Sequence, residues 1–110
     1  MYLKVLEDVE QERLLLARRI GAFLDFINKE QDNENDKRGR EIAYALSKYR
    51  EHLKLVSDDI FDKKVVSQEN LDVFRTIQGN IKLKLEELNC IESLCRKKKT
   101  NENIDNLMSK

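Results

Sequence analysis

Apolar residues recur along most of the chain at intervals of three, four or seven positions, which keeps one face of an α-helix apolar. Over residues 2–29 this face consists of Tyr2, Leu6, Val9, Leu16, Ile20, Phe23 and Ile27. Arg13 interrupts it, and further apolar residues widen it, namely Leu14, Leu15, Ala17, Leu24 and Phe26. The pattern predicts a first helix with an apolar face too wide for one neighbouring helix to cover.

Two further segments have the same periodicity. Over residues 37–62 the apolar positions step by four and three in a heptad seam: Ile42, Leu46, Tyr49, Leu53, Val56 and Ile60. Over residues 68–98 they are Phe74, Ile77, Ile81, Leu85, Leu88, Ile91 and Cys95. Ser67 is a good N-cap for this third helix, and Glu69 in the first turn complements the helix dipole.

Polar segments separate the expected helices. Residues 28–39 contain no large apolar residue, so we expect a solvated loop there, with Asn35 or Asp36 as the N-cap of the second helix. Residues 62–66 form the second break. Residues 100–110 are polar apart from three residues at helical spacing, and we expect a frayed tail, flexible or partly helical. The prediction is an all-α domain over residues 1–99, with three long antiparallel helices in an up-down-up bundle.

Composition supports this fold and limits the function. The 110 residues include no proline and three glycines, too few for the many turns of an all-β domain. Lys and Arg number 21 and so do Asp and Glu, giving zero net charge. Proteins that coat nucleic acid are usually strongly basic, so nucleic acid is not an expected partner. The wide apolar face of the first helix predicts a homo-oligomer.

The sequence offers little that could carry catalysis. His52 is the only histidine, no E-x-x-H pair or Gly-rich phosphate loop is present, and Cys90 and Cys95 lie five apart on different helix faces. We therefore expect no enzyme, cofactor or metal site. No apolar run approaches the roughly 20 residues of a membrane span. Glu7 and Asp8 stand where a signal peptide would be apolar, so we expect a cytoplasmic protein with no membrane partner.

A basic cluster, residues 37–40, is the most informative polar feature. It falls in the expected first turn of the second helix, where backbone N–H groups and Arg side chains can bind phosphate, and Gly39 would let a ligand approach the backbone. One and two turns further on come an aromatic ring, a hydroxyl and a cation. The candidate ligand-binding residues are Arg38, Gly39, Arg40, Tyr44, Ser47 and Lys48. The alternative is that nearby carboxylates, Asp32, Glu34, Asp36 and Glu41, neutralise these cations.

Residues 19–27, the polar loop and residues 39–51 together resemble the helical hairpin of the phage anti-CBASS and anti-Thoeris sponge proteins. The similarity lies in Arg40, Glu41, Ile42, Ala43, Ala45, Ser47, Lys48 and Glu51. The chain departs from that pattern at residues 52–54 and in its long third helix. The resemblance implies a non-enzymatic, oligomeric binder that sequesters a cyclic nucleotide or ADP-ribose-type immune signal in the host cytoplasm.

Two other functions are compatible with the same residues. A coiled-coil or helical-bundle interaction module, or an inhibitor of a host protein, requires only the heptads and the wide apolar face. Nucleic-acid binding would use the basic residues 96–99 and is the least favoured, because the net charge is zero.

Overall fold

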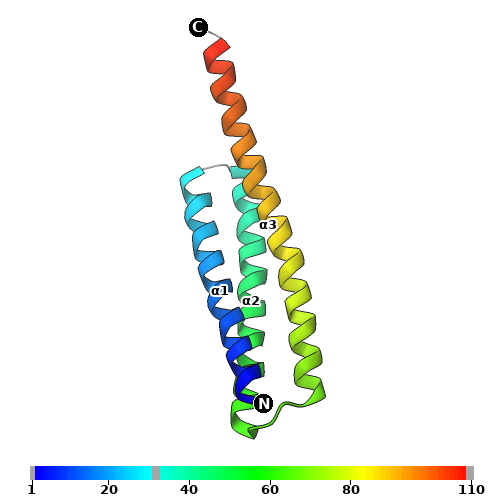
Figure 1. Cartoon of the computed structure of the whole chain (residues 1–110). Coiled ribbons are helices and arrows are strands. Elements are labelled where there is room, and N and C mark those ends of the chain that lie inside the picture. Colours follow the sequence, from blue (N-terminus) through cyan, green and yellow to red (C-terminus); the bar gives the residue numbers. More distant parts are fainter. Residues whose placement is uncertain (1, 31–32, 109–110) are drawn as a thin grey trace.

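The computed structural model describes the backbone of residues 2–30 and 33–108, and the side chains of residues 2–29 and 35–96. It contains three helices, α1 (Tyr2–Glu30), α2 (Asn33–Lys63) and α3 (Gln68–Met108), and no strand within the described residues. The helices run up, down and up, so that neighbours along the chain are antiparallel (Figure 1). The predicted all-α bundle of three long helices is confirmed.

The predicted ends of the helices differ from the observed ones where the sequence is polar. α2 begins at Asn33, four residues before the expected position, so Asn35 and Asp36 lie inside the helix and the predicted capping role is wrong. The expected loop over residues 28–39 is helical on both sides, and residues 31–32 lie outside the described part of the chain. Because this segment has no proline, and its only glycine is Gly39, both helices extend into it, and only residues 31–32 separate α1 from α2.

α3 also extends beyond its predicted end near residue 98 and continues as helix to Met108. The expected tail is therefore helical over residues 100–108, while residues 109 and 110 lie outside the described part. The backbone of α3 continues past the ends of α1 and α2 (Figure 1).

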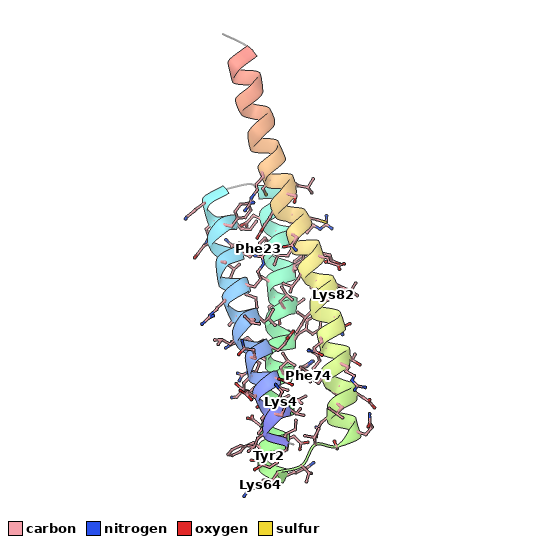
Figure 2. The ribbon with its side chains drawn as sticks, in the orientation of Figure 1. Tyr2, Lys4, Phe23, Lys64, Phe74 and Lys82 are labelled. Atoms are coloured by element: carbon pink, nitrogen blue, oxygen red, sulfur yellow. The ribbon has the colours of Figure 1, made fainter. Side chains whose placement is uncertain are left out.

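The core lies along the axis of the bundle and is built from the predicted apolar faces. Figure 2 shows side chains of the three helices in the space between them. The heptad seam of α2 is buried at every position except Tyr49, which is half-buried. The largest fully buried side chains are Phe23, Ile27, Leu46, Leu53, Ile60, Leu88, Ile91 and Val9. α2 packs extensively against both neighbours, whereas α1 and α3 approach each other at few positions.

The turn between α2 and α3 is held by hydrogen bonds at both helix ends. Lys64 adopts φ 56° and its N–H donates to the Ile60 carbonyl at 2.8 Å, which terminates α2 in a left-handed cap. Ser67 Oγ accepts from the Asn70 N–H at 3.1 Å, and Asn70 Oδ1 accepts from the Ser67 N–H at 3.2 Å. This reciprocal pair resembles a capping box, and it confirms Ser67 as the N-cap of α3.

The Asn70 side chain links this cap to α2. Its amide nitrogen donates to Asp59 Oδ2 at 3.0 Å, and Asp59 also pairs with Lys63 at 2.9 Å. The hydrogen bond from Lys63, followed by the one from Asn70, holds the pKa of the Asp59 carboxyl below its ordinary value. The cap thereby fixes the start of α3 against the end of α2.

Candidate functional site

Gly39 lies in the core and not in a ligand site. The glycine is buried against Phe23 of α1, in the upper half of the bundle in Figure 2. A Cβ at this position would lie 2.7 Å from Phe23 Cζ and 3.3 Å from Ile27 Cδ1. The expectation that Gly39 opens the backbone to a ligand is therefore wrong, because α1 already fills that space.

Arg40 is neutralised by its neighbours. Its Nε donates to both oxygens of Asp36 at 3.0 Å, in an i,i+4 ion pair on α2, and a terminal guanidinium nitrogen donates to Asn28 Oδ1 of α1. α2 begins at Asn33, so Arg40 is in the second turn, where the backbone N–H groups bond within the helix. The predicted placement of Arg40 in the first turn of the second helix is therefore wrong, and the alternative of neutralisation by Asp36 is confirmed for Arg40. The contact with Asn28 has no signal in the sequence.

Arg38 is exposed, and its side chain projects from another flank of α2 than that of Arg40. Successive residues of an α-helix are rotated by about 100°, so Arg38 and Arg40 project about 100° to either side of Gly39. Since Gly39 faces α1, Arg40 is directed to the α1–α2 side and Arg38 to the opposite flank of α2. One small ligand cannot contact both side chains across the helix.

Tyr44 and Lys48 form the exposed part of the predicted strip. The Tyr44 side chain is 65% exposed, and Lys48 Nζ lies 5.3 Å from the centre of its ring, within cation–π range. Lys48 Nζ is also 3.8 Å from Glu51 Oε2. Ser47 is half-buried and its hydroxyl donates to the Ala43 carbonyl at 3.0 Å, so its hydrogen is used within α2. The surface that remains is an aromatic ring and a cation beside the neutralised Arg40.

A second polar cluster joins the first third of α1 to the last quarter of α2. Ser57 is buried, and its hydroxyl donates to Glu10 Oε1 at 2.8 Å, while Arg13 donates to both oxygens of Glu10 at 3.0 and 2.8 Å. Partial burial raises the pKa of Glu10, but the hydrogen bonds and the charges of Arg13 and Arg50 outweigh it and hold that pKa below its ordinary value. The interruption of the apolar face at Arg13 was the only signal of this cluster.

The remaining polar side chains offer little that could act chemically. His52 lines an open hollow of about 390 Å³ between α2 and α3, with Tyr49, Val73, Ile77 and Asn80 among its other lining residues. Among the residues that the structure describes, no three His, Cys, Asp or Glu side chains gather where they could hold a metal ion. Cys90 is exposed and Cys95 buried, which agrees with the prediction that they lie on different helix faces.

The comparisons with known proteins add no relative. The chain matches no protein-family model, no curated protein and no solved structure. Over the described residues, no helix is both long enough and apolar enough to cross a membrane.

Proposed function

We propose that this chain is a non-enzymatic helical binding protein that acts as a protein–protein interaction module and assembles with further copies of itself. The observation that carries the proposal is the placement of large apolar side chains on the outer faces of the bundle. On α1, Leu14 is 48% and Leu15 51% exposed, although both belong to the wide apolar face. On α3, Leu83 and Leu94 are exposed to similar extents.

These residues lie outside the seams that hold the bundle together. The inner faces of the three helices already bury a continuous core, so the outer leucines contribute little to the fold of one chain. Burying apolar surface against a partner is favourable by about 25 cal/mol per Å². A long bundle with leucines on two outer faces therefore suits association with other helices better than capture of a small polar ligand.

Light scattering coupled to gel filtration at micromolar concentration tests this proposal, and we expect a dimer or larger species. The double variant Leu14→Glu, Leu15→Glu should lower the mass if α1 forms the contact, because it places two charges in an apolar interface. The control is Leu55→Glu, at an even more exposed leucine of α2. A wild-type chain that remains monomeric up to hundreds of micromolar would contradict self-assembly.

A second candidate function is sequestration of a phosphate-bearing nucleotide, and Tyr44 with Lys48 favours it. An exposed ring can stack on a base, and an adjacent ammonium can pair with a phosphate. The resemblance to anti-defence sponges points the same way. The geometry weighs against it, because Gly39 is covered, Arg40 is paired and Arg38 is on another flank.

The two functions differ in what raises the melting temperature. The melting temperature of a self-associating module rises with protein concentration. The melting temperature of a sponge rises with ligand concentration, because ligand at one hundred times its Kd adds about 2.7 kcal/mol to the free energy of unfolding. We would melt the chain over a concentration series, and separately with cyclic di- and trinucleotides and cyclic ADP-ribose isomers. Tyr44→Ala and Lys48→Ala should change the free energy of unfolding by no more than about 0.5 kcal/mol. If a nucleotide raises the wild-type melting temperature but not that of Lys48→Ala, the sponge is supported.

A further inference from the structure

α3 is much longer than the helices it packs against. It has 41 residues, compared with 29 in α1 and 31 in α2. Arg96 still contacts the bundle, with its guanidinium 5.4 Å from the centre of the Phe26 ring of α1. Beyond it, residues 97–108, which we call the projecting segment, continue as a helix with no other helix of the chain alongside (Figure 1).

The apolar face that packs α3 into the bundle ends where the bundle ends. Ile81, Leu88, Ile91 and Cys95 of this inner face are buried. Continuing the same steps of three and four past Cys95 leads to positions 98, 102 and 105, which are Lys, Glu and Asp. The inner register therefore carries nothing apolar in the projecting segment.

A different face of α3 carries apolar residues on both sides of this boundary. Leu83 is 60% and Leu94 50% exposed, and Cys90 is exposed in the same register. Steps of three and four from Leu94 lead to positions 97, 101, 104 and 108, the last two being Ile and Met. At the base of this outer register lies an open hollow of about 440 Å³ that Asn89, Cys90, Ser93 and Leu94 line. Beyond the bundle, apolar residues therefore recur in the outer register at Ile104 and Met108, after Lys97 and Asn101.

Several residues of the projecting segment are weak helix formers. It contains three Asn, one Thr and one Asp, all less favourable in a helix than Ala, Leu or Glu. Helix ends that lack tertiary contacts fray. No other helix of the chain lies alongside the projecting segment (Figure 1), so apolar packing against a partner would stabilise it.

We propose that residues 90–108 of α3 pair antiparallel with the same segment of a second copy. In that register Leu94 stands opposite Ile104 of the second copy, Cys90 opposite Met108, and Lys97 opposite Asn101. Every apolar position of the outer register in this segment then meets an apolar one, and the two bundles lie at opposite ends of the pair. A parallel arrangement would place Lys97 opposite Lys97, at a core position where like charges repel.

This inference rests on the proposed function and names the surface through which copies meet. The test is sedimentation equilibrium of the full chain over a concentration series, for wild type, Ile104→Glu and Asn103→Glu. Both changes place a carboxylate in the projecting segment, but only position 104 is on the outer register. Ile104→Glu should weaken self-association roughly tenfold or more, and Asn103→Glu should leave it within about twofold. Circular dichroism melts should show that both variants keep the folded bundle.

The native cysteines report the direction of pairing. Cys90 is exposed and Cys95 is buried, so mild oxidation addresses position 90. An antiparallel pair gives no Cys90–Cys90 disulfide in the wild type, and in Met108→Cys it gives a disulfide between positions 90 and 108 of different copies. A wild-type Cys90–Cys90 disulfide would overturn the antiparallel register. A monomeric wild type, or equal association in Ile104→Glu and Asn103→Glu, would overturn the surface. In the latter case the proposed function stands and the contact lies elsewhere.

Discussion

Replacing Gly39 with alanine tests the close approach of α1 and α2 most directly. The added methyl would meet Phe23 Cζ at 2.7 Å and Phe23 Cε1 at 3.0 Å, closer than carbon atoms normally come. The Phe23 side chain has no exposed surface, so its ring cannot turn into solvent without disturbing the core. The clash must therefore be relieved by moving packed side chains or by separating the two helices.

The sign of the effect follows from two opposing magnitudes. Overpacking a well-packed core costs about 1–3 kcal/mol. Replacing Gly by Ala within a helix contributes about 0.8–1 kcal/mol in the other direction. We expect Gly39→Ala to lower the free energy of unfolding by about 1 kcal/mol. A Cβ at Gly79 of α3 would meet nothing within 4 Å, so Gly79→Ala should raise that free energy by about 1 kcal/mol.

Urea denaturation followed by circular dichroism at a fixed protein concentration measures both changes. Adding Phe23→Leu removes the two ring atoms that the methyl meets. The combined loss in the double variant should therefore be smaller than the sum of the single losses, by about 1 kcal/mol. If Gly39→Ala proved as stabilising as Gly79→Ala, the two helices would not be as close as the structure has them. The conclusion that Gly39 packs against Phe23 in the core would then be wrong as well.

Three further changes test two polar contacts of the bundle and the backbone conformation that ends α2. The lowered pKa of Glu10 stabilises the wild type at neutral pH, and this stability is lost as the pH falls from 4.5 through that pKa. Glu10→Gln should remove this contribution, so its urea midpoints at pH 7 and pH 3 should differ less than those of the wild type. Arg19 bonds Asn89 at 2.7 Å and Glu92 at 2.9 Å across the sparse α1–α3 contact. Arg19→Ala should cost about 1 kcal/mol, with a measurable coupling to Glu92→Gln in a double-mutant cycle. Lys64→Gly should raise the free energy of unfolding by about 1 kcal/mol, because glycine adopts the positive φ without strain; an unchanged urea midpoint would contradict this.

The predictions from sequence succeeded for the features that apolar periodicity determines, namely which segments are helical and which face of each helix is buried. A heptad places its residues on one side of a helix whatever the rest of the chain does, and the seam of α2 is buried as expected. Helix ends in polar runs were missed, because solvated Asn, Asp and Lys are compatible with a helix face as well as with a loop. The start of α2 at Asn33 and the continuation of α3 to Met108 both fall in such runs.

The candidate site could be predicted only in part, for a similar reason. That Tyr44 and Lys48 share a helix face follows from their spacing, and the pairing of Arg40 with Asp36 follows from the i,i+4 rule. The environment of Gly39 depends on which side chain of another helix lies against it, here Phe23, and nothing within residues 37–48 encodes that. Local spacing defines a face, but the neighbouring helix determines whether that face is open.

The outer leucines of α1 and α3 lead to a last prediction about the size of the assembly. If Leu14 and Leu15 mediate one symmetric contact and the projecting segment another, each copy has two different self-complementary surfaces. Two such contacts on one chain do not close into a dimer, so the assembly grows with concentration. Ile104→Glu alone, or Leu14→Glu with Leu15→Glu, should each leave a discrete dimer, and all three changes together should give a monomer. Sedimentation velocity distinguishes these species by mass. If Ile104→Glu alone were already a monomer, α1 would make no contact between copies, and α3 would be the only self-complementary surface of the two.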